Sequence, residues 1–294
     1  MRITIASGKG GTGKTTVATA LAVSLALDKR ENQAVYFIDC DAEAPNAHLF
    51  LDPVFDRQRQ AAICIPQVDE ALCTGCGRCV EVCAFHALAL IGKKIMVFPQ
   101  LCHGCGSCTL NCPENAIREI PKTVGMLDSG RADAGIHFAR GILTVSEPMP
   151  TPIIRQLKRW RPVPPTADQE TVVILDAPPG ASCSAVEALR GSDFALLVTE
   201  PTPFGLHDLK QIAGIVREME IPAGVVINRD GIGNGSIEDF CIAEGLPILM
   251  HIPFDRTAAE GLSAGKTLVE IRPEYQERLI GLYNRIRHTL ERRL

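Results

Sequence analysis

Eight cysteines near the middle of the chain have the spacing of metal ligands. They form two sets that follow the pattern C-x2-C-x2-C-x3-C. The first set starts at Cys73 and the second at Cys102. The correspondence continues outside the cysteines, because Gly77 matches Gly106. Such self-similarity predicts two halves related by a pseudo-twofold axis. Thiolates bind zinc and iron–sulfur clusters, so this stretch predicts metal or redox chemistry.

A glycine-rich loop near the start of the chain has the spacing of a phosphate-binding site. Residues 8–15 read GKGGTGKT, which fits G-x-x-x-x-G-K-[ST]. In such a loop, backbone N–H groups surround phosphate oxygens, the lysine reaches the β- and γ-phosphates and the final hydroxyl holds Mg²⁺. The lysine is Lys14 and the hydroxyl is that of Thr15. The predicted nucleotide-binding residues of the loop are Gly8, Lys9, Gly10, Gly11, Thr12, Gly13, Lys14, Thr15 and Thr16.

The elements around this loop would place carboxylates beside it. Apolar runs predict buried parallel strands at residues 2–7, 34–38 and 172–175, with a helix at 14–27. Asp39 and Asp41 follow the second run and Asp176 follows the third. Ligands of open α/β sheets bind at the carboxyl ends of the strands, where Asp176 would accept from Mg²⁺-bound water. Asp39 or Asp41 could instead cap a helix.

The loop has a second lysine, Lys9, and the string KGGTGKT resembles the deviant Walker A signature of the ParA/MinD family of ATPases. That family also includes the nitrogenase iron protein and the Mrp-type scaffold proteins. The resemblance implies an α/β P-loop NTPase fold, with a mostly parallel sheet and helices on both faces. It also implies that Lys9 reaches the partner's nucleotide across a dimer interface and that Asp41 orients the attacking water. The implied catalytic residues are Lys9, Lys14 and Asp41, and the implied magnesium residues are Thr15, Asp39 and Asp176.

The same resemblance assigns two residues to the base of the nucleotide. Asn228 ends the run AGVVINRD and would lie against the purine, and Pro253 lies in a proline–x–aspartate turn nearby. Asn228 could instead be an ordinary turn residue. No guanine-recognition motif N-K-x-D is evident, so ATP is the expected nucleotide. The resemblance covers residues 1 to about 50 and about 145 to 294.

The cysteine pattern resembles that of bacterial two-cluster ferredoxins, in which the fourth cysteine of each run ligates the other cluster. This resemblance implies two [4Fe-4S] clusters with crossed ligands. The first would be held by Cys73, Cys76, Cys79 and Cys112, and the second by Cys102, Cys105, Cys108 and Cys83. The proline expected after the fourth cysteine is present only as Pro113, because Ala84 follows Cys83. Zinc is the alternative, but its sites usually pair two separated C-x-x-C hooks.

The predicted domain organisation follows from these two resemblances. Residues 63–121 would form an inserted α+β ferredoxin-like domain, and residues 1–62 and 122–294 a discontinuous P-loop ATPase domain. Two other cysteines, Cys40 and Cys183, lie beside the predicted nucleotide site and could be functional thiols or small buried residues. The segment from Glu274 has an apolar stripe, which predicts either a membrane-surface helix or a terminal helix packed on the sheet.

Composition excludes several classes of function. The chain has 294 residues and a formal net charge of −4, so it lacks the basic excess typical of nucleic-acid-binding proteins. No secretion signal is visible, membrane contact is not expected and we expect a cytoplasmic protein. Twelve cysteines in such a protein indicate metal or redox chemistry rather than disulfides.

Together these features predict an ATPase that binds and hydrolyses Mg-ATP, forms a homodimer on ATP binding and carries a ferredoxin-type module. The favoured role is metallocluster assembly or maturation of a client protein, which makes a redox or metallocluster protein the expected partner. Two alternatives stay open at this point. The chain could be an ATP-gated electron donor, or a redox-sensing positioning ATPase of the ParA/MinD kind.

Overall fold

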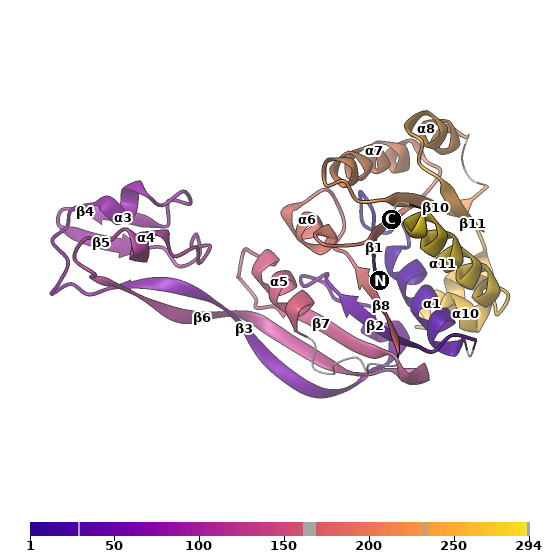
Figure 1. The fold of residues 1–294 in the computed structure, drawn as a ribbon, viewed down its shortest axis with the longest axis horizontal. Helices are drawn as coiled ribbons and strands as arrows, with labels where there is room; N and C mark the ends of the chain where they lie inside the picture. Colours follow the sequence, from indigo (N-terminus) through magenta and orange to yellow (C-terminus); the bar gives the residue numbers. More distant parts are fainter. Residues whose placement is uncertain (29, 161–168, 232, 234, 293–294) are drawn as a thin grey trace. The chain divides into compact units, whose positions relative to one another are not determined.

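The computed structural model describes residues 1–28, 30–160, 169–231, 233 and 235–292 (Figure 1). The chain divides into two compact units. The large unit comprises Met1–Arg59, Leu127–Ile142 and Ile154–Leu294. The cysteine unit comprises Gln60–Met126 and Leu143–Ile153, and therefore takes in more of the chain than the predicted insert at 63–121.

A nine-stranded sheet has the order β11-β10-β9-β1-β8-β2-β7-β6-β3. Its strands, in chain order, are β1 (Arg2–Ala6), β2 (Gln33–Asp39), β3 (Val54–Val68), β6 (Ile117–Arg131), β7 (His137–Leu143), β8 (Glu170–Asp176), β9 (Phe194–Thr199), β10 (Ala223–Asp230) and β11 (Ile248–Pro253). The pairs from β11 to β7 are parallel. The predicted α/β class with a mostly parallel sheet is therefore confirmed.

Strand register brings the predicted carboxylates to one edge of this sheet. Asp176 of β8 lies opposite Ile5 of β1 on one side and opposite Asp39 of β2 on the other. The inner residues of these strands, among them Ile5, Phe37 and Ile174, are apolar and fully buried, as expected for strands covered on both faces. Their carboxyl ends consequently meet where β1 runs into the glycine-rich loop.

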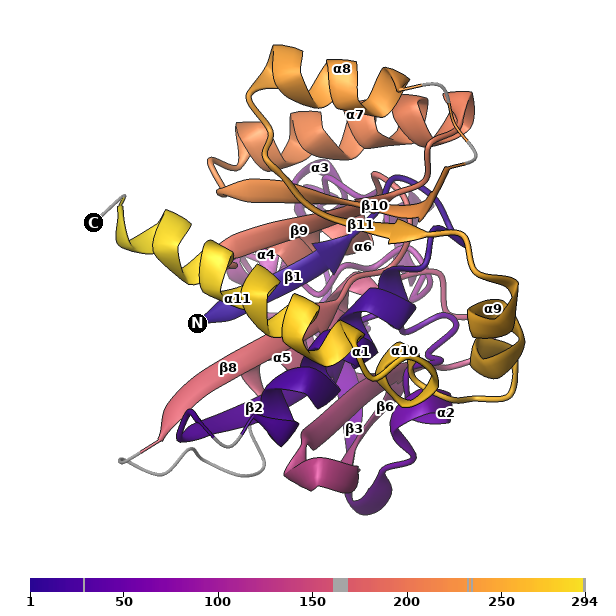
Figure 2. The same cartoon turned by 90° about the vertical axis from the view of Figure 1, so that its right-hand side faces the viewer.

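Helices cover both faces of the sheet. In Figure 2, α7 and α8 lie on one side of β9, β10 and β11, and α1 and α11 lie on the other. The helices of the large unit are α1 (Lys14–Leu27), α2 (His48–Leu51), α6 (Cys183–Leu189), α7 (Pro203–Glu218), α8 (Ser236–Glu244), α9 (Arg256–Ser263), α10 (Leu268–Ile271) and α11 (Tyr275–Glu291), while α5 (Thr151–Arg159) begins in the cysteine unit.

The C-terminal helix α11 packs into the core of the large unit. Leu279, Leu282, Tyr283 and Ile286 are almost fully buried and belong to the same cluster as Leu21 of α1. Of the two predictions for this segment, the structure shows the packed terminal helix. Within the described residues, no helix is long and apolar enough to cross a membrane.

The cysteine unit repeats one short motif. The helices α3 (Arg78–Glu81) and α4 (Ser107–Leu110) each follow a glycine in the left-handed region, Gly77 with φ 80° and Gly106 with φ 76°. A two-stranded antiparallel sheet, β4 (Leu88–Ile91) and β5 (Lys94–Val97), lies between the two motifs in the chain. The predicted correspondence of the two halves thus extends to their local structure.

Candidate functional site

The glycine-rich loop joins β1 to α1 and leaves no room for larger residues at two of its glycines. A Cβ on Gly8 would lie 2.1 Å from the backbone oxygen of Asp208. Gly13 has a φ of 92°, and a Cβ there would lie 2.2 Å from Nδ2 of Asn228. Left-handed glycines at the start of a helix leave the first N–H groups free to bind an anion. Lys14, the first residue of that helix, is 7% exposed.

Thr15 and Asp176 form the centre of the predicted magnesium site. The Thr15 hydroxyl donates to Oδ2 of Asp176 at 2.6 Å. Oδ1 of Asp176 is buried and has no hydrogen-bond partner among the described residues. Burial raises the pKa of Asp176, while Lys14 and the Thr15 hydroxyl act in the opposite direction. A buried carboxylate oxygen without a partner is costly unless a cation completes the site, so these residues fit Mg²⁺.

Asp39 and Asp41 have different surroundings. Asp39 is fully buried and accepts from the backbone N–H groups of Asp41 at 3.1 Å and of Asn46 and Ala47 at 3.0 Å. Burial, together with the neighbouring Asp176, raises the pKa of Asp39 to about 8. Asp41 is half-buried and, within the described part of the chain, accepts only from Ala44 N–H, at 3.3 Å. Asp39 therefore fixes the turn that follows β2. Asp41 accepts fewer hydrogen bonds from the described residues, so its carboxylate can still accept a hydrogen bond from a water molecule.

Neither Asp39 nor Asp41 is the N-cap of the next helix, α2, so the alternative role predicted for them as helix caps is wrong. The N-cap of α2 is Ala47, which makes no side-chain hydrogen bond. The contacts of Asp39 with Asn46 and Ala47 lie just before that helix and tie the turn to the end of β2.

Lys9 is held by a carboxylate that the sequence interpretation missed. Its ammonium group forms an ion pair with Glu200, which also pairs with Arg229 at 3.0 Å. Burial alone would raise the pKa of Glu200, but Lys9 and Arg229 outweigh it and lower the pKa. Glu200 directly follows β9, so the rule that polar residues gather at the carboxyl ends of parallel strands could have identified it.

The two residues predicted to contact the base lie at the ends of neighbouring strands. The Asn228 side chain donates from Nδ2 to the Thr12 carbonyl at 2.8 Å, so it touches the glycine-rich loop. Pro253 is exposed and lies opposite Asp230 in the pairing of β10 and β11. Asp255 caps α9 by accepting from Ala258 N–H at 3.1 Å. Contact of Asn228 and Pro253 with a purine stays a prediction.

The eight cysteines line two cavities, each with three cysteines from one repeat and the fourth from the other. The first cavity is lined by Cys73, Cys76, Cys79 and Cys112. The second is lined by Cys83, Cys102, Cys105 and Cys108. These are the two sets that the resemblance implied, although metal ligation by them stays a prediction.

Hydrogen bonds around the thiols suit an anionic, thiolate-ligated group, whereas burial opposes the charged form of three of them. Burial raises the pKa of Cys79, Cys102 and Cys108, whereas backbone and side-chain hydrogen bonds from Ser107 lower the pKa of Cys105. Backbone N–H groups also point at sulfur atoms, with distances of 3.3 Å from Ala87 to Cys83, 3.3 Å from Ala116 to Cys112 and 3.4 Å from Gly104 to Cys102. Hydrogen bonds of this kind are typical around iron–sulfur clusters.

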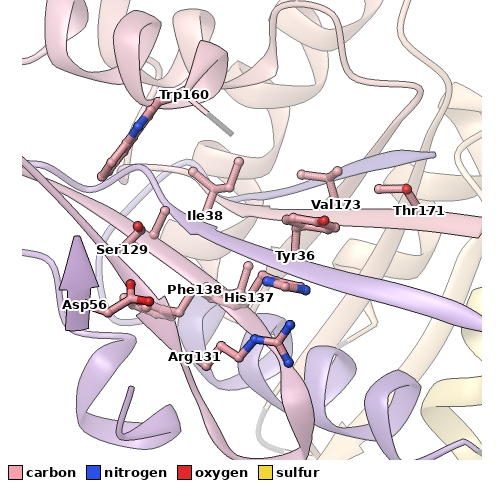
Figure 3. A pocket seen from close by; sticks show the side chains of 13 residues that line it. Tyr36, Ile38, Asp56, Ser129, Arg131, His137, Phe138, Trp160, Thr171 and Val173 are labelled. Atoms are coloured by element: carbon pink, nitrogen blue, oxygen red, sulfur yellow. The ribbon is translucent and has the colours of Figure 1, made fainter. Parts of the chain in front are cut away.

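Three features of the large unit lie outside this chemistry. A cavity on one face of the sheet is lined by Tyr36, His137, Trp160 and others, and includes none of the predicted site residues (Figure 3). Cys40 is fully buried, and burial raises the pKa of its thiol, as expected of a small core residue. Cys183 is exposed at the start of α6.

The chain has relatives of nearly its full length among known proteins. Two uncharacterised proteins of Methanocaldococcus jannaschii are 30% identical over 289 residues and 29% identical over 277 residues. These matches cover 98% and 92% of this chain, and 96% and 92% of the relatives. An iron-sulfur cluster carrier protein of Aquifex aeolicus is 29% identical over 117 residues, which is 35% of this chain and 32% of that protein.

Solved structures share the fold. The cell division ATPase MinD of Pyrococcus furiosus superposes with a TM-score of 0.56 at 22% identity, covering 98% of both chains. The septum site-determining protein MinD of Pyrococcus horikoshii, complexed with Mg-ADP, superposes with a TM-score of 0.55 at 20% identity, covering 96% of this chain and 93% of that one.

The family model of the CobQ/CobB/MinD/ParA nucleotide binding domain matches residues 3–269 of this chain. This range includes the glycine-rich loop, the two strand ends that carry the aspartates and the cysteine unit between them. A match of this extent, on an α/β sheet with the loop at its carboxyl edge, shows that the chain belongs to the CobQ/CobB/MinD/ParA family of nucleotide-binding proteins.

Proposed function

We propose that the chain binds and hydrolyses Mg-ATP at the glycine-rich loop. The observation that carries this proposal is the buried, unpartnered oxygen of Asp176 beside the Thr15 hydroxyl and Lys14. Thr15 and Asp176 hold the magnesium shell, and Asp39 fixes the turn beside it. Lys14 binds the β- and γ-phosphates, and Asp41 orients the attacking water.

ATP then brings two copies of the chain together, with Lys9 of each copy reaching the other's nucleotide. In the single chain, Lys9 is paired with Glu200. Dimerisation therefore requires Lys9 to break its ion pair with Glu200 of its own chain. The negative charge of the phosphates on the partner's nucleotide compensates for the lost ion pair.

We also propose that the two cysteine sets each hold a [4Fe-4S] cluster. Such clusters supply reversible one-electron storage. The chain contributes the thiolates, the backbone N–H groups that stabilise their charge and the left-handed glycines that let the loops approach. Four thiols around each cavity would also suit zinc, so iron content decides between the two.

Contacts within the large unit support a coupling between nucleotide and cysteine unit. Arg140 of β7 lies opposite Asp39 in the pairing with β2. Its guanidinium donates to Asp128 of β6 at 3.1 Å, and Asp128 accepts from Gln58 of β3 at 2.9 Å. Strands β3 and β6 continue into the cysteine unit. A shift of the turn after β2 would therefore be passed through Arg140 and Asp128 to the two strands that lead into the cysteine unit.

The output we favour is assembly or maturation of a metallocluster in a client protein. The partial similarity to an iron-sulfur cluster carrier supports this choice. A second candidate is ATP-gated electron donation. It is supported by the crossed arrangement of the two cysteine sets, since each cavity takes one cysteine from the other repeat.

The test uses the anaerobically reconstituted full chain with an apo-ferredoxin as acceptor. Maturation predicts that ATP accelerates transfer of iron and sulfide to the acceptor, and that Lys14→Ala abolishes this acceleration. Electron donation predicts that the iron stays on the chain while ATP changes the rate at which the reduced protein is oxidised by a viologen dye. A protein that retains no iron, or an iron protein indifferent to ATP in both assays, overturns the proposal.

A further inference from the structure

A fifth cysteine, outside both repeats, lines the second cavity. Cys64 of β3 is exposed and borders the cavity together with Cys83, Cys102, Cys105 and Cys108. Three of those four thiols, Cys83, Cys102 and Cys108, are only 8% exposed. The described residues around the first cavity include its four cysteines and no fifth.

The direction of β3 places the Cys64 side chain on the cavity side of the strand. Pro66, two positions on, also lines the cavity, whereas Ile63 and Ile65 do not and are buried. Alternate residues of a strand point to opposite faces, so Cys64 and Pro66 share the face that borders the cavity.

Gly104 brings the backbone of Cys64 next to one particular ligand position. A Cβ on Gly104 would lie 3.0 Å from the Cys64 carbonyl oxygen, and the following residue is Cys105. Cys105 is also the one exposed cysteine of the four in this set. Cys64 and Cys105 are thus exposed thiols from adjacent stretches of backbone at the same cavity.

The first repeat provides an internal comparison. Gly75 corresponds to Gly104, and a Cβ on it would lie 2.8 Å from the carbonyl oxygen of Lys93. The position that Cys64 holds beside the second cavity is therefore held by Lys93 in the first half. A lysine cannot replace a thiolate ligand, so the two halves differ at this point.

We propose that Cys64 is a reserve ligand of the second cluster, able to replace Cys105. This inference rests on the proposed function, because it requires that the two cysteine sets hold [4Fe-4S] clusters. In the exchange, the bond between iron and the Cys105 sulfur breaks as a bond between iron and the Cys64 sulfur forms. The Cys64 thiol releases its proton, Cys105 takes one up, and no oxidation state changes. The second cluster consequently has one ligand position that exchanges at the surface.

The test compares iron content and EPR spectra of reconstituted full-length variants. We expect Cys105→Ala to retain both clusters with an altered EPR signal, because Cys64 takes over. Adding Cys64→Ala should remove one cluster, whereas Cys64→Ala alone should keep both. The matched control is Cys76→Ala, the equivalent exposed position of the first set, which should lose one cluster outright. If Cys105→Ala loses as much iron as Cys76→Ala, the inference is wrong.

A second measurement does not depend on the stability of the double variant. Iodoacetamide should alkylate Cys64 in the iron-loaded parent protein, where it is free, and should fail to do so in iron-loaded Cys105→Ala, where it is a ligand. Equal alkylation in both proteins overturns the inference. A parent protein without iron overturns the proposed function instead, so the two failures are distinguishable.

Discussion

Lys9 and Lys14 belong to one loop yet interact with different carboxylates. Lys14 is buried and lowers the pKa of Asp176, opposing the effect of burial. Lys9 is partly exposed and paired with Glu200, at the end of a different strand. Their substitutions should therefore separate binding of the nucleotide from association of two copies.

Replacing Lys14 by alanine should remove the phosphate contact. We expect Lys14→Ala to weaken binding of Mg-ATP at least tenfold, which corresponds to about 1.4 kcal/mol. Fluorescence titration with a labelled ATP analogue measures this loss. Lys210→Ala, on the exposed surface of α7, is the control and should bind as the parent does. Unchanged affinity in Lys14→Ala would contradict the assignment of the loop.

Changing Glu200 should affect association rather than binding. Glu200→Gln keeps the shape of the side chain but releases Lys9, so we expect half-maximal dimerisation at a severalfold lower ATP concentration. Lys9→Ala should bind ATP and stay monomeric. Light scattering with and without ATP measures both. A Glu200→Gln variant that needs more ATP than the parent would show that Glu200 does not compete for Lys9.

At the scale of elements, aromatic pairs join β7 to β2. Tyr36 stacks on His137 with ring centroids 4.5 Å apart, and Phe37 stacks on Phe138 at 5.7 Å on the other face. Burial lowers the pKa of His137, and Arg131 lowers it further. Nδ1 of His137 is buried and has no hydrogen-bond partner among the described residues. Protonation of this ring should therefore weaken the pairing that carries β7.

This contact predicts a pH dependence of stability. Because the folded state lowers the pKa of His137, its contribution is fully present above the ordinary histidine pKa of about 6.5 and is lost as the pH falls toward the lowered value. His137→Phe keeps the stacked ring and cannot be protonated. The difference in thermal midpoint between this variant and the parent should therefore grow in favour of the variant as the pH is lowered from about 7.5 to about 5.5.

Differential scanning calorimetry of both proteins at each pH gives the difference. Loss of the clusters in acid should affect both alike, because His137 belongs to the large unit. His207→Phe, at an exposed position of α7, should show no such trend. A constant difference between His137→Phe and the parent would contradict the role of this ring.

At the scale of the molecule, the crossed cavities make the two cysteine repeats interdependent. Each cavity takes its fourth cysteine from the other repeat, so neither repeat can complete a site alone. Iron content of paired variants tests this. We expect Cys73→Ala to lose one cluster and Cys73→Ala with Cys112→Ala to lose no more, because both residues serve the same cavity. Cys73→Ala with Cys83→Ala should lose both clusters; the reverse pattern would mean that each repeat serves its own cluster.

The sequence predicted those parts of the site that depend on local motifs. The loop, the strand-end aspartates and the cysteine sets follow from short patterns, and the structure brings the members of each set together. Glu200 and Cys64 were missed because their roles depend on strands that are distant in the chain. The length of β3 was also missed, since a long strand with exposed polar residues resembles a linker in sequence.

Strands β3 and β6 form the outer edge of the same sheet whose middle carries the nucleotide loop. Deleting them together with the cysteine unit would turn β7 into a bare edge, and bare edges recruit other chains into aggregates. Protein engineers who want a minimal nucleotide-binding unit should therefore splice just beyond the hydrogen bond between Gln58 and Asp128, where a tight hairpin turn can join the two stubs.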